Sequence, residues 1–66
     1  MTRLNLYDSG MRPTSAQYYS PEAAIQALQS GLYPNYTDAS IITDGRTTHV
    51  ARREVGEKLW TIKERP

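Results

Sequence analysis

The last third of this 66-residue chain holds most of the side chains that could carry out chemistry or bind a charged ligand. The only histidine, His49, and the only tryptophan, Trp60, lie there together with six of the eight Lys and Arg residues. Arginine and lysine bind phosphates and carboxylates, and arginine on a β-ribbon also reaches base edges in a nucleic-acid groove. One candidate site is therefore a nucleic-acid-binding surface made of Arg46, Arg52, Arg53, Lys58 and Lys63.

Catalysis needs more than this stretch offers. His49 is the one imidazole available as a general base, and the chain has no cysteine. Neither a histidine-activated nucleophile nor a zinc or iron site has a full set of groups. The four glycines stand apart from one another, so a glycine-rich phosphate loop is missing. The sequence predicts a protein that is not an enzyme and that uses no metal or cofactor.

A second candidate site is a protein-binding surface. Five tyrosines and no phenylalanine are more tyrosine than a small helix-on-sheet core needs, and tyrosine and arginine are enriched in protein interfaces. Ile42 and Leu59 are expected on the outer face of the sheet, where they would form a contact patch. The candidate partner-binding residues are Ile42, His49, Arg52, Arg53, Leu59, Tyr33 and Tyr36.

The charge of the chain favours the second site. The formal net charge is +1, with a pI of about 8.1, and three glutamates lie among the cations of the last third. Domains that bind nucleic acid through phosphates are usually far more basic. A solvated sheet face with ion pairs across its strands also explains the pattern. A protein partner is favoured, and DNA or RNA is the alternative.

Few elements are available to position these residues. The clearest is a helix between Ser20 and Gly31, because Ser20 can cap it, Pro21 suits its first position and Gly31 suits its end. The dipeptide Asp44-Gly45 is a strong hairpin signal. Strands are expected over residues 1–7, 39–43, 46–54 and 58–63, and a loop over 11–19.

The Asp44-Gly45 turn predicts the register of the sheet. A two-residue turn pairs Ile41 with Thr48 and Ala39 with Val50, and the following hairpin pairs Val50 with Trp60. The face beneath the helix would carry Ile41, Thr48, Val50, Trp60 and Ile62. The opposite face would carry Ile42, Thr47, His49, Ala51, Arg53, Leu59, Thr61 and Lys63. A slip of one residue would exchange the faces.

The predicted fold class is α+β, with one short helix packed on a small antiparallel sheet in the order β-α-β-β-β and a C-terminal three-stranded meander. Residues 1–66 are expected to form a single domain. A core this small without disulfides is marginally stable, so another protein or a homodimer partner would add stability. The chain has no cysteine, no apolar leader and no apolar run of about 18 residues, so a cytoplasmic protein outside the membrane is expected.

These observations predict a small non-enzymatic protein-binding module that acts as an inhibitor, an adaptor or an accessory subunit of a larger macromolecular machine. Compact phage- or plasmid-encoded regulators share this size and architecture, which is an analogy and not a family resemblance. The alternative is a DNA- or RNA-binding module that uses the arginine-rich C-terminal hairpin.

Overall fold

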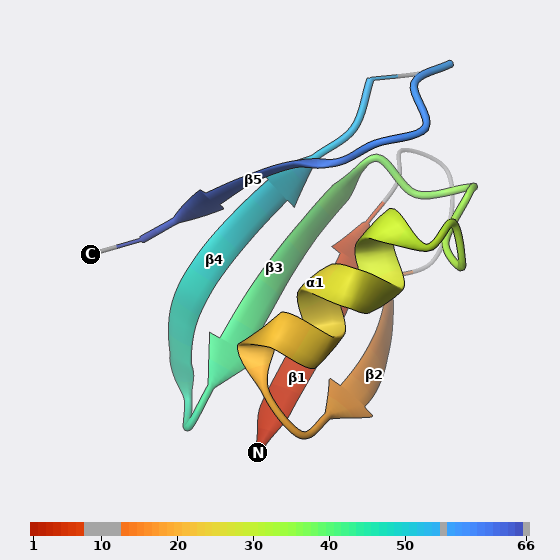
Figure 1. Cartoon of the computed structure of the whole chain (residues 1–66). Helices are drawn as coiled ribbons and strands as arrows, with labels where there is room; N and C mark the ends of the chain where they lie inside the picture. The colour runs from red at the N-terminus through yellow and green to blue at the C-terminus, as the bar shows by residue number, and fades with distance from the viewer. Residues whose placement is uncertain (8–12, 55, 66) are drawn as a thin grey trace.

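The computed structural model describes residues 1–7, 13–54 and 56–65, and these residues form one helix on one antiparallel sheet (Figure 1). The strand order is β2-β1-β3-β4-β5, and α1 covers one face (Figure 1). The predicted α+β class and the C-terminal meander are confirmed. The elements are β1 (Thr2–Tyr7), β2 (Thr14–Tyr18), α1 (Pro21–Gln29), β3 (Asp38–Thr43), β4 (Arg46–Arg52) and β5 (Thr61–Glu64). None of the described helical residues forms a helix of the length and apolarity that crossing a membrane requires.

Strand β2 replaces part of the loop that the sequence predicts. It pairs antiparallel with β1, with Tyr18 opposite Thr2 and Thr14 opposite Leu6. The element order is therefore β-β-α-β-β-β, with one strand more than predicted. Its sequence, TSAQY, lacks the alternation of strongly apolar residues that indicates a strand buried on one face. β2 is an edge strand, and only part of it meets the core.

Helix α1 lies where the sequence places it. The Ser20 hydroxyl accepts a hydrogen bond from the Ala23 N–H at 3.2 Å, and Pro21 occupies the first turn. Gly31 follows the helix with a φ of 87°, in the left-handed region where glycine is favoured. The helix buries Ala24, Ala27 and Leu28. A helix of nine residues needs this packing to be stable.

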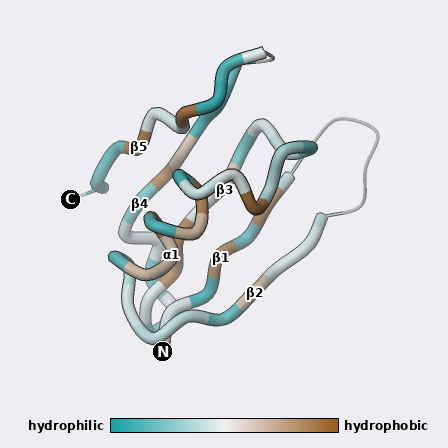
Figure 2. The backbone as a smooth tube through the Cα atoms, turned by 45° about the vertical axis from the view of Figure 1, so that its right-hand side comes forward, coloured by the Kyte–Doolittle hydropathy of each residue, from teal (hydrophilic) through white to brown (hydrophobic). Residues whose placement is uncertain are grey.

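The core lies between α1 and the sheet. Figure 2 shows hydrophobic stretches on the central strands and on α1. The core residues are Leu4, Leu6, Ala24, Leu28, Ala39, Ile41, Ala51 and Trp60, with Tyr18, Ile25, Tyr33, Tyr36 and Ile62 packed around them. Three residues of this set are alanines. The core is small, as expected for a chain of this length.

A bulge in β4 changes the register that the hairpin turn predicts. Ile41 pairs with His49, and Ala39 pairs with Ala51. The predicted partners lie one residue earlier in β4, so that prediction is wrong. Thr48 is the extra residue, and its hydroxyl donates a hydrogen bond to the Ile41 carbonyl at 3.3 Å.

The bulge also exchanges the two faces of β4 beyond it. Val50, predicted to be in the core, lies on the face away from α1 together with Arg52. Ala51, predicted to face outward, is buried beneath α1, and the half-buried His49 points to the same side. The assignment of these residues to faces is corrected accordingly.

Strand β5 begins later than predicted. It starts at Thr61 rather than at residue 58, and Val50 pairs with Lys63 rather than with Trp60. Trp60 is still a core residue, with 5% of its surface exposed, but it belongs to the loop before the strand. Leu59 lies in the same loop, so it does not lie on a strand face as predicted.

Candidate protein-binding site

One face of the sheet, which we call the uncovered face, points away from α1. The strand pairings place thirteen residues on it: Arg3, Asn5, Tyr7, Ser15, Gln17, Asp38, Ser40, Ile42, Thr47, Val50, Arg52, Thr61 and Lys63. Ile42 and Val50 are half-buried among polar neighbours. Such a face is polar enough to meet water, and Ile42 and Val50 give it some apolar area as well.

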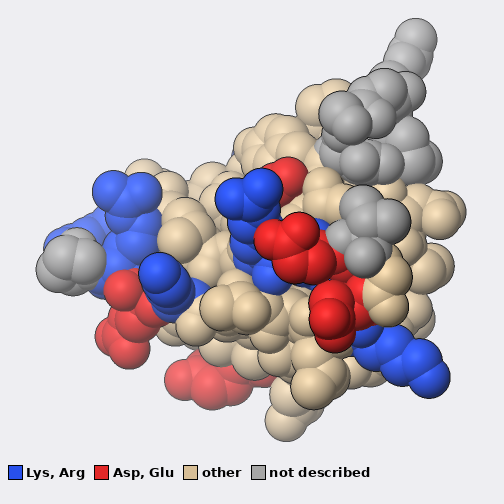
Figure 3. Space-filling view, turned by 90° about the horizontal axis from the view of Figure 1, so that it is seen from above, with Lys and Arg blue, Asp and Glu red and all other residues tan. Residues whose placement is uncertain are grey.

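A hollow of about 760 Å³, which we call the β4–β5 hollow, lies where the uncovered face meets the loop between these strands. Its apolar lining is Val50, Leu59 and Trp60, and Leu59 is 68% exposed. Thr61 lines it together with two cations, Arg52 and Lys63, and two carboxylates, Glu54 and Glu57. Figure 3, which looks down on the upper end of the molecule in Figure 1, shows blue and red side chains intermixed there.

Arg53 positions the loops beside this hollow. Its guanidinium donates to the carbonyls of Pro34 at 2.6 Å, of Glu57 at 2.8 Å and of Tyr36 at 2.7 and 3.1 Å. It also lies 5.7 Å from the centre of the Trp60 ring, which is within cation–π range. These contacts join the loop after α1 to the loop after β4. The half-buried Arg53 guanidinium is therefore engaged by backbone carbonyls of its own chain.

Tyr33 and Tyr36 are half-buried and pack against the core. The hydroxyls of Tyr33 and Tyr18 are 2.6 Å apart, and the rings of Tyr33 and Tyr36 meet edge to face with their centres 6.4 Å apart. Burial, and then the hydrogen bond with Tyr18, raise the pKa of Tyr33 to about 12. Both candidate tyrosines therefore tie the loop after α1 to the core.

The structure separates His49 and Ile42 from the β4–β5 hollow. His49 is half-buried on the α1 side of β4, with its Nδ1 atom 2.9 Å from the Thr48 hydroxyl. Ile42 lines a smaller hollow of about 270 Å³ at the opposite end of the uncovered face. Of the seven candidate partner residues, only Arg52 and Leu59 line the β4–β5 hollow.

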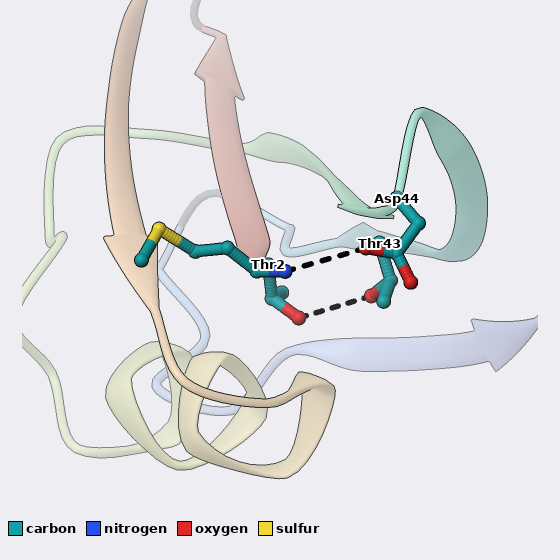
Figure 4. Close-up of polar contacts among 4 residues, drawn as sticks. Thr2, Thr43 and Asp44 are labelled. Atoms are coloured by element: carbon teal, nitrogen blue, oxygen red, sulfur yellow. Dashed lines mark hydrogen bonds and ion pairs between the residues drawn. The ribbon is translucent and has the colours of Figure 1, made fainter.

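Polar contacts between β1 and β3 hold the end of the sheet near Ile42. The hydroxyls of Thr2 and Thr43 are 3.0 Å apart, and the amino group of Met1 lies 3.3 Å from a carboxylate oxygen of Asp44 (Figure 4). The threonine pair gives the buried Thr2 hydroxyl its partner. The ion pair is exposed and contributes little to stability.

The cations of the alternative nucleic-acid site do not share one surface. Arg52 and Lys63 lie together on the uncovered face, whereas Arg46 lies at the other end of β4. Lys58 is exposed in the loop before β5, and Arg53 is held by backbone carbonyls. Two of the five predicted cations are therefore neighbours on the uncovered face.

Gln29 is a residue of this site that the sequence did not indicate. Its side-chain amide accepts a hydrogen bond from the Trp60 N–H at 2.9 Å and donates one to the Trp60 carbonyl at 3.0 Å. These bonds attach the loop carrying Leu59 and Trp60 to the end of α1. Glutamine on a helix surface is common, so its sequence position gives no signal of this contact.

The chain matches no known protein-family model, and neither a curated protein nor a solved structure matches it. Within the described ranges, His, Asp and Glu side chains form no group of three that would hold a metal ion. What the β4–β5 hollow can do follows from its lining. Apolar side chains beside charges of both signs suit the surface of another protein, whereas carboxylates such as Glu54 and Glu57 repel a phosphate.

Proposed function

We propose that this protein is a non-enzymatic protein-binding module that contacts its partner through the β4–β5 hollow. Leu59 carries this proposal. It is 68% exposed, and it stands beside two further apolar lining residues, Val50 and Trp60. An apolar side chain from a partner would bury Leu59 and pack against this lining, as in the desolvated centre of a typical interface.

The charges around the hollow support a protein partner. Arg52 and Lys63 are balanced by Glu54 and Glu57, so the local field is not strongly positive. Charges of both signs at the rim of an interface select a partner with the complementary pattern. A chain of 66 residues that acts in this way would occupy or bridge surfaces of a larger protein, as an inhibitor, an adaptor or an accessory subunit.

The exposed leucines provide a matched test. Leu59→Asp places a charge in the hollow, whereas Leu32→Asp places the same charge on a leucine that is 65% exposed and does not line it. The affinity-tagged chain is used to co-purify a partner, and the identified partner is then titrated by calorimetry. We expect Leu59→Asp to weaken binding at least about tenfold, because burying an unpaired carboxylate is costly, while Leu32→Asp binds normally.

Circular dichroism shows whether both variants are folded. Equal binding of the partner by both folded variants would place the contact elsewhere and contradict the proposal.

DNA or RNA binding is the second candidate, favoured by one observation. The uncovered face carries three cations, Arg3, Arg52 and Lys63, and one carboxylate, Asp38. Fluorescence anisotropy with labelled duplex DNA and single-stranded RNA, at salt concentrations of about 50 and 200 mM, tests it. Micromolar binding that is lost at the higher salt would support this candidate, and no binding at either salt would remove it.

A further inference from the structure

The outer edge of β5 presents free backbone groups. Where the structure describes the chain, no strand pairs with this edge. On the inner side β5 pairs with β4, and the Arg65 N–H donates to the Thr48 carbonyl at 2.8 Å. Hydrogen bonds alternate along an antiparallel pair, so the backbone groups of residues 61, 63 and 65 point toward β4. Those of Ile62 and Glu64 point to the outer edge.

Gln29 already occupies the first position on this edge. Its amide makes two hydrogen bonds to the backbone of Trp60, the donor and acceptor pair that a neighbouring strand would make. No side chain among the described residues does the same for Ile62 or Glu64. The edge is therefore closed at Trp60 and open at the next two outward-facing positions.

The open part of the edge lies beside the β4–β5 hollow. Thr61 and Lys63, which alternate with the outward-facing residues, point their side chains to the uncovered face and line the hollow with Leu59. Arg65 lies two residues beyond Lys63 and, by the same alternation, continues this row. An extended segment that paired with β5 would therefore direct every second side chain toward the hollow and toward Lys63 and Arg65.

A second copy of this chain does not suit the edge. Pairing Ile62 of one copy with Glu64 of the other sets Lys63 directly opposite Lys63, and like charges in this position are destabilising. Centring the pair on Ile62 needs the backbone groups of Trp60, which Gln29 occupies. Centring it on Glu64 sets two carboxylates opposite each other. The edge therefore favours a strand of different sequence.

We propose that the outer edge of β5 binds an extended segment of another protein by antiparallel strand addition. The segment carries an acidic residue opposite Lys63 and, two residues later, a leucine opposite Thr61 that enters the hollow beside Leu59. The acidic residue meets Lys63 and Arg65, and the β-branched residue between the two lies against the half-buried Ile62. This inference rests on the proposed function and names the partner segment for the same site.

A charge exchange tests the predicted complementarity at Lys63. The probes are two fluorescein-labelled peptides with serine flanks, one containing Lys-Glu-Val-Leu and the other Lys-Lys-Val-Leu, titrated with the full chain by anisotropy. We expect the glutamate peptide to bind at least about tenfold more tightly than the lysine peptide. Lys63→Glu should reverse this order. Failure of the glutamate peptide to bind, or equal binding of both peptides, would overturn the proposal.

A proline substitution tests the backbone contact separately from charge. Glu64→Pro removes an N–H that points outward and leaves the bonds to β4 in place, and proline is tolerated on an edge strand in this orientation. Glu64→Ala is the matched control, since it removes the same carboxylate and keeps the N–H. We expect Glu64→Pro to bind the glutamate peptide at least about tenfold more weakly than Glu64→Ala. Equal affinities would exclude strand addition.

Hydrogen exchange gives an independent readout. Bound peptide should slow exchange of the Ile62 and Glu64 amides by about tenfold or more, and unchanged exchange at saturation would argue against pairing.

With the identified partner, the Leu59 and Glu64 variants separate the two proposals. If Leu59→Asp abolishes association and Glu64→Pro does not, the proposed function stands and the edge inference fails. If neither variant affects association, both fail.

Discussion

The contacts of Arg53 give the most direct test of how this end of the molecule is held together. Its guanidinium donates to three backbone carbonyls, from Pro34, Tyr36 and Glu57, and it lies over the ring of Trp60. No other described side chain makes as many of the hydrogen bonds found at this end. Replacing Arg53 with alanine should therefore destabilise the fold and loosen the loop that lines the β4–β5 hollow.

The magnitude follows from the interactions that alanine cannot make. A hydrogen bond from a charged group contributes about 1.5–3 kcal/mol when it is buried. Because water replaces the guanidinium at these partly exposed carbonyls, we take about 0.5–1 kcal/mol for each of the three acceptors, or about 1.5–3 kcal/mol together. A cation–π interaction at such a site adds about 0.5–1 kcal/mol. Arg53→Ala should then lower the free energy of unfolding by about 2–4 kcal/mol. A core of this size provides only about 3–5 kcal/mol in total, so the variant should be close to unfolding.

Urea denaturation followed by Trp60 fluorescence measures this change, and the neighbouring Arg52 provides the control. Arg52 is exposed on the uncovered face and makes no such set of bonds, so Arg52→Ala should change the unfolding free energy by less than about 0.5 kcal/mol. Arg53→Lys should lose most of the same energy, because an ammonium group cannot span three carbonyls as a planar guanidinium does. Equal stability of the two alanine variants, or a fully stable Arg53→Lys, would refute the conclusion that the Arg53 guanidinium holds these loops together.

Three further outcomes are expected. Gln29→Ala should cost about 1–2 kcal/mol, because it removes two hydrogen bonds, and should increase the quenching of Trp60 fluorescence by acrylamide. The pKa of Tyr33 is raised from 10.0 to about 12, so the folded state holds the hydroxyl proton more tightly than the unfolded state does. This difference contributes stability that is fully present below pH 10 and is lost as the pH rises to 12. Absorbance titration should show this late step, and Tyr18→Phe should move it to lower pH. Gly45→Ala should cost about 1–2 kcal/mol in a urea titration, because Gly45 has a φ of 79° and open space around it, which leaves backbone conformation as the only cost.

Each of these outcomes has its own control. Gln26 is exposed on the same helix, so Gln26→Ala should leave both stability and quenching unchanged. A tyrosine titration without a step near pH 12 would contradict the burial of Tyr33 together with its hydrogen bond to Tyr18. Gly45→Asn should cost less than Gly45→Ala, since asparagine adopts the left-handed conformation more readily, and the reverse order would show that the turn is not the source of the strain.

The parts of the fold that the sequence could predict are those decided by local chemistry. The start and the end of α1 depend on Ser20, Pro21 and Gly31, and each acts on its immediate neighbours. The hairpin turn depends on Asp44 and Gly45, which both have positive φ in the structure. These signals extend over a few residues, and a single sequence contains all the information needed to read them.

Strand β2 depends on its neighbour in the sheet rather than on its own sequence. A strand buried on one face is recognised by apolar residues at every second position. β2 has Thr14, Ala16 and Tyr18 on the face toward α1, and at the edge of the sheet small or amphipathic residues are sufficient there. What makes this segment a strand is the free edge of β1 beside it. That is a property of the assembled sheet, which the segment's own composition does not express.

The bulge at Thr48 decides which side chains reach the candidate site, and no local sequence signal indicates this bulge. Without the Thr48 bulge, the turn would have directed Arg53 to the open side of the sheet with His49. With it, Arg53 turns inward to the carbonyls of the two loops, and Arg52 takes the outer face beside Lys63. Adjacent arginines with the same intrinsic chemistry thus have opposite roles, one holding the loops and one lining the hollow. Which of them lines the hollow depends on the register of the whole hairpin, so the three-dimensional pairing, and not the residue type, decides the surface on which each arginine lies.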